Sequence, residues 1–105
     1  MASGNALKTY HSTLAASTVD TVTLDAWSRY ILIVNKSTTA TDIIYVTTDG
    51  STPHDSGANT FTVPANTSKL LFNEGVEPEP ALGLAGSTVV KLISTGTPAY
   101  AVEKN

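Results

Sequence analysis

The stretch Arg29–Lys36, RYILIVNK, is the strongest indication of the fold of this chain. Between its charged ends, Tyr30 to Val34 run without a polar interruption. An apolar run of this length is typical of a strand whose two faces are both covered, and thus of a central strand. The run Asp42–Thr48, DIIYVTT, has the same character. We therefore expect two central strands close together in the sequence.

Shorter runs of the same kind recur about every ten residues, with turn signals between them. They cover Lys8–Leu14, Val19–Leu24, Asn59–Val63, Ser68–Phe72, Thr88–Thr95 and Ala99–Glu103. No window of ten or more residues shows helical spacing of Leu, Ala and Glu. The pattern predicts an all-β fold of about eight short strands: a small antiparallel β-sandwich or barrel, immunoglobulin-like or jelly-roll-like.

The chain has 105 residues, the size of one domain. Residues 1–7 are small and polar, and we interpret them as a flexible N-terminal arm. Residues 8–105 are expected to form a single β domain. Its longest irregular stretch is Asn73–Gly86, where three glycines and two prolines predict a loop.

Composition argues against several classes of function. The net charge is −3, and the six Lys and Arg residues are scattered, so neither nucleic-acid binding nor a polybasic membrane contact is expected. Cysteine is absent, which excludes disulfides and Cys-ligated metals. The first residues lack a secretory signal pattern, and no apolar run approaches the roughly 20 residues of a membrane span. We expect synthesis in a cytoplasm.

Residues 47–57, TTDGSTPHDSG, crowd acids, a histidine and hydroxyls into one short stretch. The stretch also carries turn signals, because Asp49-Gly50 and Ser56-Gly57 favour turns and Pro53 stiffens the chain. We interpret it as a structured loop between two strands. If it has a function, we expect it to be an exposed contact loop.

Two chemical alternatives exist for this loop. Calcium binding through Asp49, Asp55 and carbonyl oxygens stays open, although the spacing does not fit an EF-hand. Catalysis by Ser51, His54 and Asp55 is disfavoured, because catalytic triads are built from distant segments. We expect no catalytic residue, metal or cofactor.

Other polar and aromatic residues offer weaker candidates. A lone His11 favours a surface or packing role over metal binding. Glu74, Glu77 and Glu79 suggest a solvated extended loop. Four aromatic residues could form a stacking platform for sugars or proteins: Tyr10, Trp27, Tyr30 and Tyr100. We expect Tyr30 to pack in the core instead, and for Trp27 both interpretations stay open.

Three segments give the chain a resemblance that covers nearly its whole length. TVDTV at 18–22, TTDGSTPHDSG at 47–57 and VKLISTGTPAYAV at 90–102 resemble segments of small virion proteins of tailed phages that infect actinobacteria. The resemblance implies a head decoration or fibre-type protein. The chain departs from that pattern at His54, where the family pattern suggests threonine.

A second resemblance is local. IIYVTTDGSTP at 43–53 is similar to the signature of the C-terminal immunoglobulin-like modules of chitobiases and related glycoside hydrolases. There the segment is a strand with its hairpin loop, which implies the same arrangement here.

Together these observations predict a non-enzymatic virion structural protein that decorates and stabilises the outer head surface. The expected partner is the major capsid protein, and a homotrimer is expected because capsids offer threefold sites. A tail or fibre position is the near alternative, and a carbohydrate-binding or adhesion module is the alternative from another class. The candidate contact residues are Ala2, Ser3, Gly4, Asn5, Ala6, Leu7, Trp27, Asp49, His54 and Asp55.

Overall fold

The computed structural model describes residues 8–24, 30–72 and 89–104, which form eight strands. The strands are β1 (Lys8–Thr13), β2 (Asp20–Thr23), β3 (Tyr30–Asn35), β4 (Ile44–Thr47), β5 (Phe61–Val63), β6 (Ser68–Phe72), β7 (Val89–Ile93) and β8 (Ala99–Lys104). Each predicted strand is present, with ends that differ by a few residues. The predicted all-β class is confirmed.

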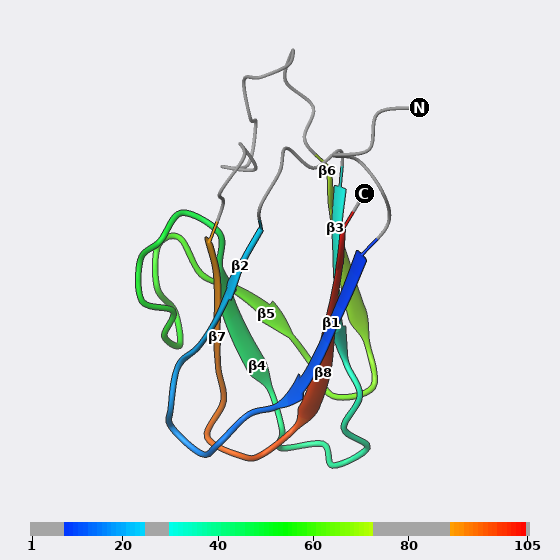
Figure 1. Cartoon of the computed structure of the whole chain (residues 1–105). Coiled ribbons are helices and arrows are strands. Elements are labelled where there is room, and N and C mark those ends of the chain that lie inside the picture. Colours follow the sequence, from blue (N-terminus) through cyan, green and yellow to red (C-terminus); the bar gives the residue numbers. More distant parts are fainter. Residues whose placement is uncertain (1–7, 25–29, 73–88, 105) are drawn as a thin grey trace.

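The strands form two four-stranded antiparallel sheets that face each other (Figure 1). Sheet A has the order β1-β8-β3-β6, and sheet B has the order β2-β7-β4-β5. The first strand pairs with the last, β2 with β7, β3 with β6 and β4 with β5. This is the pairing of one long hairpin rolled into a sandwich, which is the jelly-roll topology. The strand order therefore selects the jelly-roll form among the predicted alternatives.

The core lies between the inner faces of the two sheets. Side chains alternate along each strand, so every second residue points inward. In β3, Ile31 and Ile33 are fully buried, while Leu32 between them is half-buried. Val46 and Leu92 occupy the matching inner positions of sheet B, where they pair across β4 and β7. Each such side chain contributes about 1.5–3 kcal/mol by leaving water.

The prediction that Tyr30 packs in the core is wrong. Tyr30 shares its face with Leu32 and Val34, and all three are half-buried on the outer side of sheet A. The cause is the two-residue period of a strand, which sends every second residue of an unbroken apolar run outward. Only one face of the apolar run Tyr30–Val34, the face with Ile31 and Ile33, therefore contributes to the core.

Polar side chains among the described residues connect the sheets. Asn35, at the end of β3, is 1% exposed, and its Nδ2 donates to the carbonyl oxygens of Asp42 (2.7 Å) and Val63 (3.0 Å). Tyr100 of sheet A is also buried, and its hydroxyl donates to Asp20 Oδ2 of sheet B at 3.0 Å. Both contacts supply buried polar groups with partners.

At one end of the sandwich, the β1–β2 and β7–β8 connections are tied together. Leu14 N donates to Pro98 O at 2.9 Å, and Ser17 N donates to Ser94 O at 2.7 Å. Ser17 takes the left-handed conformation, with φ 55°, which is uncommon for a residue other than glycine. These bonds fix Ser17 and Ser94 side by side next to sheet B.

Candidate functional site

The segment singled out in the sequence is the connection between β4 and β5, as predicted. Its first turn is closed by Asp49, whose Oδ1 accepts hydrogen bonds from Ser51 N (3.0 Å) and Ser51 Oγ. Gly50 has φ 85°, a conformation that glycine adopts without steric cost. The hydrogen bonds from Ser51 to the carboxylate lower the pKa of Asp49. The carboxylate is thus used to shape the turn.

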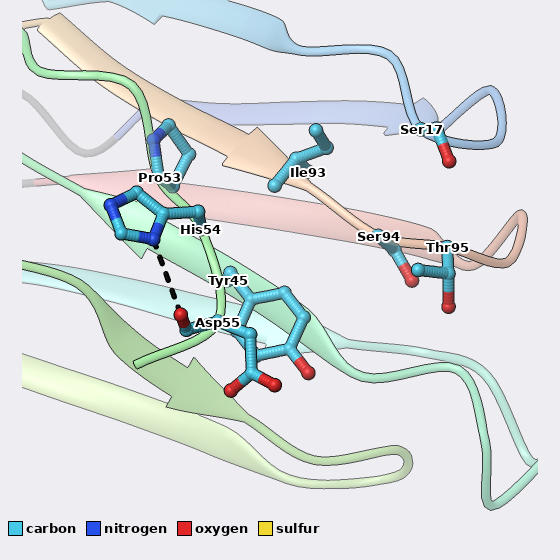
Figure 2. A pocket seen from close by; sticks show the side chains of 8 residues that line it. All are labelled: Ser17, Tyr45, Pro53, His54, Asp55, Ile93, Ser94 and Thr95. Carbon is cyan, nitrogen blue, oxygen red and sulfur yellow. Dashed lines mark hydrogen bonds between the residues drawn. The ribbon is translucent and has the colours of Figure 1, made fainter. Parts of the chain in front are cut away.

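The connection then folds back over the outer face of sheet B. Thr47 points outward from β4, yet it is 0% exposed. Its Oγ1 donates to Ser51 O, and Pro53 is buried as well. Figure 2 shows Pro53 and His54 at one end of a pocket whose middle is formed by Tyr45 and Ile93. The proline therefore anchors the connection to the sheet, while Asp49, His54 and Asp55 stay exposed.

The second half of the connection holds His54 in place. His54 N donates to Thr60 Oγ1 at 3.3 Å, and Gly57 N donates to His54 O at 3.0 Å. A Cβ added to Gly57 would lie 2.6 Å from Thr60 Oγ1 and 2.9 Å from His54 Nε2. A side chain at position 57 would therefore force the side chain of Thr60 or His54 to move.

The pocket has a volume of about 230 Å³ and lies against the outer face of sheet B (Figure 2). Its wall consists of Ser17, Tyr45, Pro53, His54, Asp55, Ile93, Ser94 and Thr95. Tyr45 and Ile93 are cross-strand partners and form the base. The pocket therefore combines an apolar base with a carboxylate, an imidazole and several hydroxyls.

The structure does not bring the suggested catalytic residues into a chain of hydrogen bonds. Ser51 Oγ donates to Asp49, whereas His54 Nδ1 lies 3.2 Å from the carbonyl oxygen of Asp55. Within residues 8–24, 30–72 and 89–104, no three His, Asp or Glu side chains gather where a metal could bind. The same residues contain no helix that could span a bilayer.

The other candidates are dispersed. Tyr100 lies in the core and Tyr10 packs against it, so neither joins Tyr30 in a platform. His11 is exposed on β1, and its Nδ1 lies 2.7 Å from Lys36 Nζ. The remaining candidates lie outside the described residues: Ala2, Ser3, Gly4, Asn5, Ala6, Leu7, Trp27, Glu74, Glu77 and Glu79.

An apolar surface on the opposite sheet was not predicted. Leu32 pairs directly with Leu70, and Val34 pairs with Ala101. By strand alternation these four residues share the outer face of sheet A, and we call them the sheet A stripe. Leu70 is 45% exposed, which makes it the most exposed of the four. Leu32 and Val34 are half-buried, and Ala101 is buried.

Both surfaces were missed for the same physical reason. The pocket base and the stripe are made by cross-strand neighbours such as Tyr45 and Ile93, which lie far apart in the sequence. A strand register is needed to bring them together. The unbroken run at Tyr30–Val34 did contain a signal for the stripe, because every second residue of an apolar strand must lie on its outer face.

No protein-family model matches this chain, and a comparison with curated proteins likewise found no match. Among solved structures, the fold is similar to that in the crystal structure of PirA. The TM-score is 0.55 with 12% sequence identity, and the match covers 91% of each chain. At this identity the likeness concerns the fold alone.

Proposed function

We propose that this chain is a non-enzymatic virion structural protein that binds the outer surface of a phage head and stabilises it. The observation that supports the proposal best is the sheet A stripe, in which the exposed Leu70 adjoins the half-buried Leu32 and Val34, with the buried Ala101 beside them. Apolar side chains left at the surface are typical of protein interaction sites. The partner would be the major capsid protein.

The surroundings of the stripe suit a specific contact. Thr9, Thr13 and Ser68 take exposed outward positions on the strands at either edge of sheet A. Glu103 and His11 lie on the same face, opposite Leu32 and Ala101. An apolar centre with a polar rim is the usual composition of a protein interface. The resemblance to virion proteins of actinobacteriophages points to the same class of partner.

The proposed assembly on the head is a homotrimer. A head shell offers threefold positions, and closed rings are the common solution for identical subunits. Assembly would also stabilise a small domain without disulfides by mass action. A tail or fibre position would use the same stripe on another virion protein.

Cosedimentation tests the proposal. Wild-type protein mixed with purified heads of the phage that carries this gene is expected to pellet with the heads and to saturate. Leu70→Glu is expected to weaken head binding at least tenfold, since burying one leucine contributes about 1.5–3 kcal/mol. Far-UV circular dichroism would verify that this variant folds.

The matched control is Thr23→Glu, which places the same charge at an exposed position of sheet B. Its binding should equal that of the wild type. Wild-type protein that stays in the supernatant at every ratio would contradict the head assignment. Sedimentation with purified tails instead would move the proposal to the tail.

A further inference from the structure

We infer that the pocket on the outer face of sheet B binds a single neutral sugar ring, a pyranose. This site is separate from the sheet A stripe and does not involve Trp27. The inference comes from three features of the pocket: its base, its polar wall and its size.

The base offers an aromatic ring beside aliphatic groups. Tyr45 and Ile93 are cross-strand neighbours, both half-buried, and the buried Pro53 closes one side (Figure 2). The C–H face of a pyranose is apolar and flat, so it can pack on such a base. A tyrosine ring provides both a large apolar surface and a hydroxyl at its edge.

The wall offers hydrogen-bonding groups of mixed type. In Figure 2 the Asp55 carboxylate lies beside Tyr45, and the exposed Ser17 and Thr95 lie at the far end of the pocket. Ser94 lies there too, but it is buried and its Oγ accepts from Gly96 N at 3.2 Å. An ionised carboxylate only accepts hydrogen bonds, whereas each hydroxyl both donates and accepts. A ligand that carries several hydroxyls matches this set. The negative charge of Asp55 disfavours phosphates and acidic sugars.

The wall is also built in advance. Ser17 holds its left-handed conformation through the bond from its N–H to Ser94 O. The backbone of His54 is held by the bond from its N–H to Thr60 Oγ1 and by the bond from Gly57 N to its carbonyl oxygen. Groups that are already ordered lose little freedom when a ligand binds.

The size selects one ring. A volume of about 230 Å³ lies below the roughly 300–1,000 Å³ typical of sites for drug-sized ligands. A monosaccharide, or the terminal residue of a longer glycan, is the ligand of this size that carries both an apolar face and several hydroxyls. Affinity in the millimolar range is expected for so small a contact.

The test is an NMR titration of the full chain with methyl glycosides of glucose, galactose, mannose and N-acetylglucosamine. At least one glycoside should produce saturable shifts, confined to the amides of the pocket wall and the Tyr45 ring. Inorganic phosphate and tetramethylammonium serve as anionic and cationic probes and should leave these signals unchanged. A trisaccharide that ends in the best sugar should bind as well as the free glycoside if the site takes the end of a glycan, and more weakly if the site takes only the free sugar.

Variants locate the site. Tyr45→Ala should weaken binding about tenfold, while Tyr45→Phe keeps the ring and should stay within a few fold of the wild type. Asp55→Asn should weaken binding several-fold. Tyr30→Ala on the other sheet and Asp49→Asn, which retains an Oδ1 acceptor, are the matched controls and should bind normally.

Three results would overturn the inference. The first is the absence of saturable shifts with all four glycosides. The second is unchanged binding by a folded Tyr45→Ala variant. The third is a response of the pocket signals to phosphate or tetramethylammonium alone. The chemical-shift titration of the wild-type protein tests the site even if a variant does not fold.

Discussion

At the scale of single residues, Asn35 is a buried polar group that connects the two sheets. It continues the inward series of Ile31 and Ile33, but it ends that series with an amide. Its Nδ2 donates to two backbone carbonyl oxygens, and its Oδ1 accepts from Ser37 N at 3.0 Å. Every polar atom of this side chain therefore has a partner.

Replacing Asn35 by alanine should lower the free energy of unfolding by about 2–3 kcal/mol, because buried backbone groups would lose their partners. Urea denaturation followed by circular dichroism measures this change. The matched control is Asn59→Ala, at an exposed position, which should change stability by less than about 0.5 kcal/mol. Equal effects of the two substitutions would refute the role of Asn35.

Tyr100 makes the free energy of unfolding decrease as the pH rises in the alkaline range. Burial raises the pKa of Tyr100 to about 12, and the hydrogen bond and charge of Asp20 add to the shift. Since an unfolded tyrosine titrates near 10, the folded state holds this proton more tightly. The stabilisation is complete below pH 10 and is lost as the pH rises toward 12, by an amount on the order of 1–2 kcal/mol.

The measurement is the free energy of unfolding between pH 8 and about 11, in wild type and in Tyr100→Phe. The wild type should lose stability over the upper part of this range, and the variant should lose less, because phenylalanine does not titrate. Parallel curves for the two proteins would show that Tyr100 does not cause the dependence.

At the scale of elements, the β4–β5 connection is a folded part of the sandwich. Its two turns are closed by Asp49 and by the backbone around His54, and Pro53 is buried between them. The sequence allowed both turns to be predicted, because Asp-Gly and Ser-Gly pairs favour tight turns. It did not reveal that the segment packs on Tyr45, since that contact depends on which face the chain folds over.

Asp49→Ala should destabilise this connection by about 1 kcal/mol, because Ser51 N loses its acceptor. Asp49→Asn keeps an acceptor and should cost less. The lowered pKa of Asp49 adds a pH dependence: the stabilisation is present above the ordinary value of 3.8 and is lost as the pH falls through the folded value. Thermal unfolding at pH 7 and pH 2 should therefore show a smaller effect of Asp49→Ala in acid.

At the scale of the whole molecule, the pattern of strands was predictable and their arrangement was not. Local alternation and turn residues mark each strand, so all eight were expected at nearly the right residues. The sequence left several sandwich topologies open. The order is set by ladder pairs between distant segments, such as His11 of β1 with Ala101 of β8, and such pairs carry no local signal. The pocket and the sheet A stripe depend on that order, which is why neither was foreseen.

The proposed contact of sheet A with a phage head is best tested by cryo-electron microscopy of heads saturated with the protein. The proposal predicts extra density on the outer shell at threefold positions, with three copies that each turn β3 and β6 toward the capsid protein. Heads without added density, or density in which sheet B makes the contact, would contradict it.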